Sequence, residues 1–206
     1  MTIPIKFCGV TTPEDAVAAV EAGADLIGLN FSAQSVRRVL VEQARSIIGA
    51  TPEFHRFTGV FVEQNSDEVE AVRRELGLAH CQTYSTPWPE GSIAAFRVRS
   101  AEDIAHIRAL LATSPKPMAV LIDSYVAGAM GGTGHKAPWD LLVGQDFDVP
   151  LILAGGLTPD NVAEAIRVVK PWGVDVASGI ESSPGRKDAG KMRAFVAAVR
   201  GAERAL

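Results

Sequence analysis

Several kinds of residue are scarce in this chain of 206 residues, and each shortage excludes a class of protein. Two cysteines can form at most one disulfide, so the fold does not depend on a disulfide framework. We expect Cys8 and Cys81 to be free thiols. The four histidines stand far apart, and no Cys-x-x-Cys or His-x-x-x-His spacing occurs. No metal site is therefore predicted.

Positive charge and long hydrophobic runs are also lacking. Twenty basic residues stand against 24 acidic residues, which gives a net charge of −4 and excludes the basic surface that binds nucleic acid. No run approaches the roughly 18 apolar residues of a membrane span, and the first residues lack the pattern of a signal peptide. We expect a cytoplasmic protein with neither nucleic acid nor membrane as a partner.

Hydrophobic residues make up 47% of the chain and charged residues 21%, as in globular proteins. Short apolar runs alternate with segments of helical periodicity along the whole chain. Most runs are apolar on both faces, which is typical of parallel strands covered by helices. The predicted strands are Ile3–Cys8, Asp25–Phe31, Phe57–Val62, Leu78–Thr83, Ile93–Val98, Met118–Asp123, Pro150–Leu153 and Val174–Ala177.

Helix starts are visible between these strands. In Thr12-Pro13-Glu14-Asp15 a hydroxyl can cap the first turn, proline fits the first helical position, and acids face the positive end of the helix dipole. Thr158-Pro159-Asp160-Asn161 repeats these features and predicts a second start of the same kind. Further helices, with Asn65 and Ser100 as caps, are predicted over Val41–Ile48, Ser66–Leu76, Ala101–Ala112 and Asp188–Arg200.

Eight strands with right-handed crossovers allow an open doubly wound sheet or a closed (β/α)8 barrel. The open sheet usually has a Gly-x-Gly-x-x-Gly turn after its first strand, and Cys8-Gly9-Val10-Thr11-Thr12-Pro13 has no such turn. The length is near the lower limit of roughly 200 residues for a barrel, and the connections are short. No linker divides the chain. We predict an α/β protein with one domain over residues 1–206, a parallel eight-stranded TIM barrel.

Reactive groups of such barrels lie at the C-terminal ends of the strands. The first predicted strand ends in Cys8 and the sixth in Asp123, a candidate base and a candidate acid for moving a proton between carbon and oxygen. Cys8 could instead be a small buried apolar residue, which is our interpretation of Cys81. Asp123 ends an apolar run, where a charge is costly unless it reaches solvent, a cap or a ligand.

Glycines follow the last two predicted strands, as Gly155-Gly156 and in Ser178-Gly179. They allow backbone N–H groups to approach a phosphate closely, although glycines also simply form tight turns. Phosphate sites of barrels usually fall in these two loops, which favours a phosphorylated small-molecule ligand. After the second strand, Arg37 or Arg38 could bind a substrate carboxylate or be merely solvated.

Several longer segments together resemble one known family. They are Lys6-Phe7-Cys8-Gly9-Val10-Thr11, Glu21-Ala22-Gly23-Ala24-Asp25-Leu26-Ile27-Gly28, Ser35-Val36-Arg37, Gly59-Val60-Phe61-Val62, Leu121-Ile122-Asp123, Gly131-Gly132-Thr133-Gly134, Leu153-Ala154-Gly155-Gly156-Leu157-Thr158-Pro159 and Ser178-Gly179-Ile180-Glu181-Ser182-Ser183-Pro184-Gly185, followed by Lys187-Asp188. In these segments the chain is similar to the phosphoribosylanthranilate isomerases of tryptophan biosynthesis.

The resemblance implies an Amadori rearrangement of an aminoaldose to an aminoketose, without metal or cofactor. Cys8 would be the general base that takes the C2′ proton, with its thiol pKa lowered by nearby groups. Asp123 would be the general acid that protonates the furanose ring oxygen, and Arg37 would hold the anthranilate carboxylate. The phosphate would lie on the backbone of Gly155, Gly156, Ser178 and Gly179. A monomer and a homodimer both remain open.

Some segments depart from the family pattern. Gln82-Thr83-Tyr84-Ser85-Thr86 stands where Gln-Leu-His-Gly-Asp is usual, and Ala137-Pro138-Trp139 where Phe-Asp-Trp is usual. Asn30 replaces an aliphatic residue and Arg38 a tyrosine. All of these changes affect the side expected nearer the aryl group. Two alternatives therefore stay open: a related phosphosugar aminoaldose-ketose isomerase with altered aryl specificity, or a phosphate-binding barrel that does not catalyse.

Overall fold

Residue alternation along the strands separates two layers in the fold. The structure is a computed structural model that describes residues 2–89, 91–123 and 139–205. In β1 (Ile5–Cys8), Ile5 and Phe7 are fully buried on the outer face, where Phe7 meets Phe195 with ring centroids 6.1 Å apart. Lys6 and Cys8 alternate with them and point to the inside.

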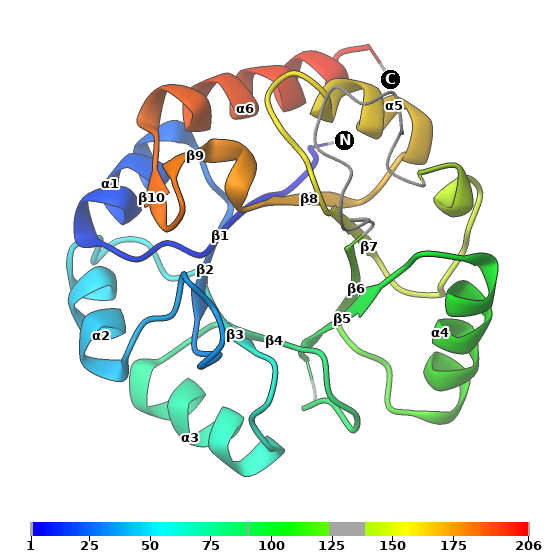
Figure 1. Ribbon diagram of the computed structural model, residues 1–206, viewed down its shortest axis with the longest axis horizontal. Helices are drawn as coiled ribbons and strands as arrows, with labels where there is room; N and C mark the ends of the chain where they lie inside the picture. The colour runs from blue at the N-terminus through cyan, green and yellow to red at the C-terminus, as the bar shows by residue number, and fades with distance from the viewer. Residues whose placement is uncertain (1, 90, 124–138, 206) are drawn as a thin grey trace.

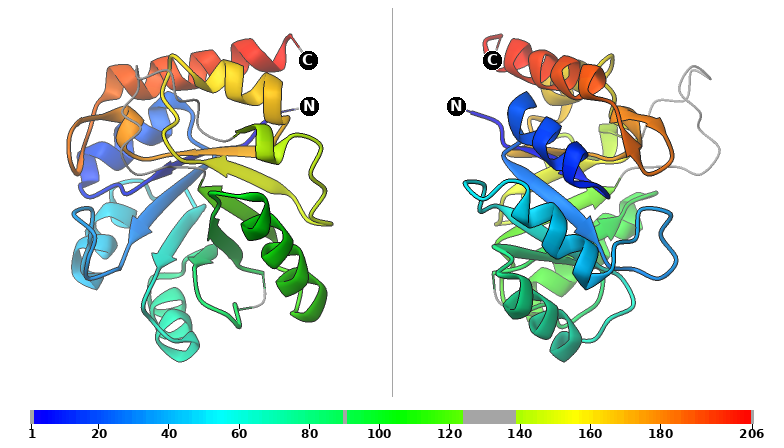
Figure 2. Two further views of the ribbon diagram at one scale, coloured as in Figure 1. Left: turned by 45° about the vertical axis from the view of Figure 1, so that its right-hand side comes forward. Right: turned by 90° about the vertical axis from the view of Figure 1, so that its left-hand side faces the viewer.

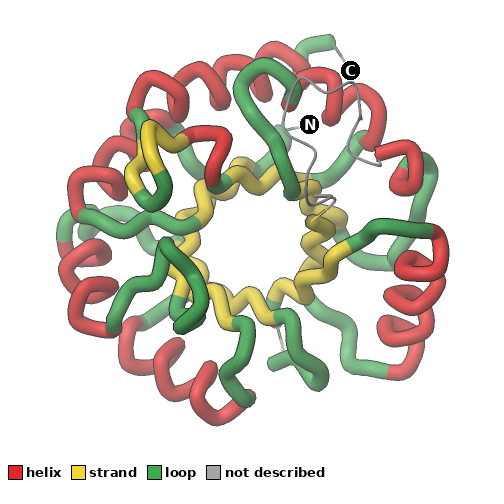
Figure 3. Tube along the Cα trace, viewed as in Figure 1, coloured by secondary structure: helices red, strands yellow, loops and turns green. Residues whose placement is uncertain are grey.

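Eight parallel strands close into a barrel in sequential order, as Figures 1 and 3 show down its axis. This closure confirms the predicted barrel and excludes the open sheet. The predicted strand ends differ from the observed ends by no more than two residues, because ladder hydrogen bonds rather than apolar runs set the ends. The other strands are β2 (Leu26–Asn30), β3 (Phe57–Phe61), β4 (His80–Thr83), β5 (Ile93–Arg97), β6 (Ala119–Asp123), β7 (Leu151–Ala154) and β8 (Gly173–Val176).

Helices surround this barrel (Figures 2 and 3). They are α1 (Pro13–Ala22), α2 (Val41–Gly49), α3 (Ser66–Leu76), α4 (Ala101–Thr113), α5 (Val162–Val169) and α6 (Ala189–Glu203). Two short 3-10 turns, η1 (Trp139–Leu142) and η2 (Ser178–Ile180), and a hairpin of β9 (Glu181–Ser183) with β10 (Arg186–Lys187) complete the described elements. The described residues between β4 and β5 form no helix, so the alternation of strand and helix is broken there.

Two predicted helix caps are confirmed. The Thr12 hydroxyl accepts a hydrogen bond from the Asp15 backbone N–H at 3.1 Å, at the start of α1. The Asn65 side chain accepts from the backbone N–H groups of Asp67 and Glu68, each at 3.0 Å, at the start of α3. Each bond satisfies a donor that the first helical turn leaves unpaired.

The second Thr-Pro segment does not repeat the first, and that prediction was wrong. Helix α5 begins only at Val162, with Asn161 at the N-cap. The Asn161 side chain accepts from the Thr158 backbone N–H at 2.8 Å, which closes a turn before the helix. Asparagine competes for the backbone in this way and delays the helix start. Ser100 does occupy the N-cap of α4, but its side chain makes no capping bond to a backbone N–H of that helix's described first turn and instead bonds the Glu102 side chain.

Apolar side chains pack on both sides of the strands. The larger cluster lies between the barrel and its helices and includes Phe7, Phe61 and Phe195. The smaller cluster fills part of the barrel interior and consists of Ile93, Ala95, Ala119, Leu121, Ile152 and Ala154. Cys8 and Cys81 are both free thiols and Cys81 is buried, which confirms the expectation from the sequence. None of the described helices is both long and apolar enough to cross a membrane.

Gly59 tests how tightly the outer layer is packed. A Cβ at this position would lie 2.6 Å from the Phe61 ring and 2.8 Å from Leu78 Cδ1. We expect Gly59→Ala to lower the free energy of unfolding by about 1–3 kcal/mol, measured by urea denaturation, because added volume strains a packed core. Gly49, at the end of α2, has no atom within 4 Å of such a Cβ. Gly49→Ala should therefore be neutral or stabilising by about 0.5–1 kcal/mol, and equal losses in both variants would contradict the packing argument.

Candidate active site

A cavity of about 490 Å³ opens where the parallel strands end. Its lining includes the last residue of six strands, namely Cys8, Asn30, Arg97, Asp123, Ala154 and Val176. Because all strands run the same way, their C-terminal ends meet at one end of the barrel, and side chains far apart in sequence share one space. The segment after β2 and the β9–β10 hairpin lie at this same end (Figure 2).

Six of the seven predicted site residues line this cavity: Cys8, Arg37, Asp123, Gly155, Gly156 and Ser178. The seventh, Gly179, packs behind it. A Cβ on Gly179 would overlap the carbonyl oxygen of Leu157, so Gly179 lets the loops after β7 and β8 touch. Gly155 and Gly156 have φ angles of 89° and 64°, a conformation that glycine adopts without strain. The predicted anion site therefore consists of glycine backbone at Gly155 and Gly156, next to loops that pack closely at Gly179.

A buried ion pair lies beside Cys8 inside the barrel. Lys6 Nζ and Asp175 Oδ1 are 2.6 Å apart, on register partners of β1 and β8. Burial alone would lower the pKa of Lys6, but Asp175 and then Cys8 outweigh it, and the pKa is raised. Lys6 therefore remains charged next to the thiol.

The expectation that nearby groups lower the pKa of the Cys8 thiol was wrong. Burial raises the pKa of Cys8, and the opposing charge of Lys6 does not fully compensate. Asp175 acts in the same direction as burial, whereas Lys187 acts with Lys6. Desolvation disfavours a thiolate more than one already paired ammonium favours it. The resting thiol is thus mostly protonated at neutral pH.

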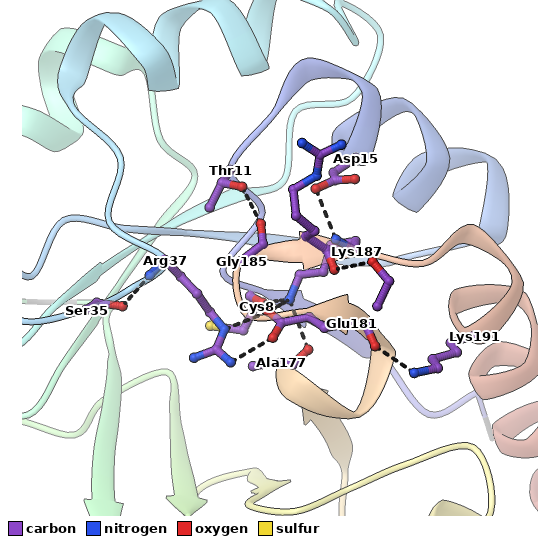
Figure 4. A network of polar contacts seen from close by, with 12 residues as sticks. Cys8, Thr11, Asp15, Ser35, Arg37, Ala177, Glu181, Gly185, Lys187 and Lys191 are labelled. Atoms are coloured by element: carbon purple, nitrogen blue, oxygen red, sulfur yellow. Dashed lines mark hydrogen bonds and ion pairs between the residues drawn. The ribbon is translucent and has the colours of Figure 1, made fainter.

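Arg37 is tied to a carboxylate that the sequence did not single out. Its Nε and Nη2 donate to Glu181 Oε1 and Oε2 at 2.6 and 2.8 Å (Figure 4). Glu181 in turn accepts from Lys187 Nζ at 3.0 Å. Glu181 and Lys187 pair across the β9–β10 hairpin, and the Pro184-Gly185 turn signal between them could have predicted this.

Tyr84 and Arg97 line the side of the cavity that departs from the family pattern. The Arg97 guanidinium lies 5.7 Å from the centre of the Tyr84 ring. Burial, and then the charge of Asp123, raises the pKa of Tyr84 to about 12. Gln82 also lines the cavity, and its Oε1 is buried without a partner among the described residues. Gln82 on β4 and Tyr84 just beyond its end are two residues apart and both line the cavity, a spacing visible in the sequence.

The last departure from the family pattern is only partly visible. Trp139 is buried in η1, whereas Ala137 and Pro138 and the Gly131–Gly134 segment lie outside the described residues. Within the described part of the chain, no group of three or more His, Cys, Asp or Glu side chains is arranged to hold a metal ion.

Comparison with known proteins identifies the family. A model of the N-(5′-phosphoribosyl)anthranilate isomerase family matches residues 5–198. The chain belongs to the phosphoribosylanthranilate isomerase family. A relative from Pseudomonas fluorescens Pf0-1, named N-(5′-phosphoribosyl)anthranilate isomerase, is 46% identical over 206 aligned positions that cover 95% of this chain and 97% of the relative.

Solved phosphoribosylanthranilate isomerases share the barrel. One from Thermotoga maritima has a TM-score of 0.85 and 32% identity, over 97% of this chain and 100% of the other. Another phosphoribosylanthranilate isomerase structure, in complex with reduced 1-(o-carboxyphenylamino)-1-deoxyribulose 5-phosphate, has a TM-score of 0.82 and 30% identity over the same shares. These matches confirm the resemblance inferred from the motifs.

Alkylation tests the raised pKa of Cys8. Because the thiolate is the nucleophile, the rate of Cys8 modification by iodoacetamide should be low at pH 7 and rise with pH through and beyond ~8.5, the value of a free thiol. Cys81, with its pKa raised to about 11 by burial and 2% exposed, should stay unmodified. Peptide mass spectrometry separates the two sites. A Cys8 rate that is already maximal at pH 7 would contradict the assignment.

Proposed function

We propose that the chain converts N-(5-phosphoribosyl)anthranilate to 1-(o-carboxyphenylamino)-1-deoxyribulose 5-phosphate by general acid–base catalysis. One observation carries the proposal: Cys8 and Asp123 line the same cavity, which Gly155, Gly156 and Ser178 also line. A base, an acid and an anion-binding wall thus surround one space of about 490 Å³. Family membership supports the same reaction.

Asp123 begins the reaction as general acid. Its proton passes to the furanose ring oxygen as the C1′–O bond breaks, and the nitrogen lone pair forms a C1′=N bond. The ring opens to a protonated imine, and Asp123 is left as a carboxylate. Asp123 ends β6 half-buried at the cavity, where such a proton transfer can occur.

Cys8 then acts as general base. Its thiolate takes the proton from C2′, the C2′–H electrons form a C1′=C2′ bond, and the imine becomes neutral. The resulting enol-amine gives the aminoketose when C1′ gains a proton and the C2′ hydroxyl loses one. No oxidant or reductant is needed, since only protons move. The raised pKa of Cys8 makes its thiolate scarce but strongly basic, and Lys6 stabilises it.

Two further groups would orient the substrate. Backbone at Gly155, Gly156 and Ser178 would hold the phosphate at one side, with Gly179 shaping the loop contact. Arg37, 24% exposed, would hold the aryl carboxylate at the other side. Binding both ends places the sugar between Asp123 and Cys8, which favours reaction through proximity and orientation.

A second candidate is an isomerase of the same chemistry with a different aryl preference. Tyr84 and Arg97 in the cavity favour it, because an aromatic ring and a second cation stand on the departing side. Comparing kcat/KM for phosphoribosylanthranilate and for analogues with a substituted aryl group decides between the two. The cytoplasmic location and the choice between monomer and homodimer stay predictions; one related Thermotoga maritima protein is described as dimeric.

Removing either proton-transfer group tests the reaction. Cys8→Ala and Asp123→Asn should each lower kcat by roughly 10²-fold or more, measured with freshly made phosphoribosylanthranilate. Cys81→Ala removes the other thiol, which is buried outside the cavity lining, and should leave kcat unchanged. Turnover that survives both cavity substitutions would contradict the proposed roles. A wild-type protein that binds the product analogue without turnover would instead favour the non-catalytic barrel.

Gly179→Ala tests the phosphate wall. The new Cβ would overlap the Leu157 carbonyl oxygen and force the loops after β7 and β8 apart. Because the backbone donors would move with the loops, we expect KM to rise about tenfold or more, with a smaller change in kcat. Gly201→Ala on α6, where the nearest atom is 4.0 Å away on Arg204, is the matched control. An unchanged KM in Gly179→Ala would argue against phosphate binding there.

A further inference from the structure

The Arg37 guanidinium uses only one of its edges to bind Glu181. The two bonds at 2.6 and 2.8 Å come from Nε and Nη2, the side-on edge. Arginine has five N–H donors in a planar fork. The end-on edge, made by Nη1 and the second hydrogen of Nη2, is not used in this pair. A fixed side-on edge therefore fixes the direction in which the other edge points.

Glu181 is itself held in place. Its side chain is only 4% exposed, and Oε1 accepts from Lys187 Nζ as well as from Arg37. Lys187 is fully buried and also donates to the carbonyl oxygens of Cys8 and Ala177, at 2.7 and 3.0 Å. Lys191 donates to the Glu181 backbone carbonyl at 2.6 Å (Figure 4). This network joins the ends of β1 and β8 to the carboxylate that holds Arg37.

The rest of Arg37 is guided toward the same place. Its backbone N–H donates to Ser35 Oγ at 3.1 Å. Its aliphatic stem crosses Gly9, where a Cβ would overlap Arg37 Cδ and where φ is 71°. The stem can therefore pass over the end of β1 only because residue 9 is glycine. Both the path and the end of the side chain are fixed before any ligand binds.

The charges of three residues explain how Glu181 can hold Arg37 while Arg37 still attracts an anionic ligand. Arg37 and Glu181 alone would form a neutral pair. Lys187 adds a second cation against the single carboxylate, so the three residues carry one net positive charge. Arg37 is the member of the three that lines the cavity. A ligand in the cavity would therefore meet this net positive charge at the end-on edge of Arg37.

We propose that Glu181, supported by Lys187, is a positioning residue that aims the end-on edge of Arg37 at the aryl carboxylate of the substrate. The proposal rests on the proposed function, since it needs Arg37 to bind that carboxylate. Glu181 itself touches no substrate. Fixing the guanidinium beforehand removes the entropy that a free arginine side chain would lose on binding.

Two ligands measure the effect. One is reduced 1-(o-carboxyphenylamino)-1-deoxyribulose 5-phosphate, and the other is the same molecule without the aryl carboxyl. We define the ratio as the Kd of the carboxyl-free ligand divided by the Kd of the ligand with the carboxyl, both from calorimetry. This ratio reports recognition of the carboxyl alone. Glu181→Gln should reduce the wild-type ratio about tenfold, the scale of a hydrogen bond to a charged group, and leave binding of the carboxyl-free ligand nearly unchanged.

A charge-matched variant separates positioning from simple electrostatics. Glu181→Gln raises the net charge of the three residues from one to two, so pure attraction would strengthen carboxyl recognition. Glu181→Gln combined with Lys187→Met restores a net charge of one and avoids an unpaired buried cation. The proposal expects weaker recognition in both variants. Stronger recognition in Glu181→Gln, or a ratio equal to the wild-type ratio in both, would overturn it.

Two further comparisons complete the experiment. Glu70 binds Arg73 on α3 through the same two nitrogens, at 2.7 and 2.8 Å, away from the cavity, so Glu70→Gln is the matched control and should keep the wild-type ratio. In an Arg37→Ala background, Glu181→Gln should have no further effect on the ratio, and an additional loss would overturn the proposal. If the wild-type protein turns over substrate but binds the two ligands equally well, Arg37 does not recognise the carboxyl and the positioning proposal is wrong. If the wild-type protein shows no turnover, the proposed function itself is wrong.

Discussion

The closure of the barrel between β1 and β8 is the constraint on which the site depends. Lys6 and Asp175 are register partners across this junction, and their buried ion pair lies beside Cys8. Just beyond the strand ends, Lys187 binds carbonyl oxygens from both sides of the same junction, those of Cys8 and Ala177. Losing one member of a buried ion pair costs about 3–5 kcal/mol, so the Lys6–Asp175 pair stabilises the junction that carries this end of the cavity.

An acidic chain can still offer an anionic ligand a favourable site, because a few cations gather around one cavity. The net charge of −4 is spread over the whole chain, whereas the cavity has Arg37 and Arg97 in its lining and Lys6 and Lys187 nearby. Lys6 and Lys187 are each partnered by a buried carboxylate, which limits the cost of burying them. Coulomb interactions weaken with distance, so these nearby cations matter more to the site than the net charge of the whole chain.

The sequence predicted what depends on residue type and spacing. Strand alternation and the absence of a dinucleotide-binding turn were enough to choose the closed barrel, and position at strand ends was enough to group Cys8 with Asp123. It could not predict what depends on desolvation or on exact contacts. The sign of the Cys8 pKa shift depends on how buried the thiol is, and the start of α5 depends on a side-chain bond of Asn161. Glu181 and Lys187 stood in the sequence only as part of a motif, and the structure shows that Glu181 is the common partner of Arg37 and Lys187.

Arg37 and Arg97, on two sides of the cavity, are held by different interactions. This difference affects which residues around the cavity can change. Arg37 is fixed by two charge-assisted hydrogen bonds that it donates to a buried carboxylate, so even a small change at Glu181 disturbs its direction. Arg97 lies over the Tyr84 ring, a contact that depends less on direction and tolerates sliding. Arg97 is also the register partner of Asp123 on the neighbouring strand. Residues near Tyr84 can therefore change while Arg37 stays fixed. Each such change acts beside Asp123, so under the proposed roles it would alter proton transfer as well as aryl binding.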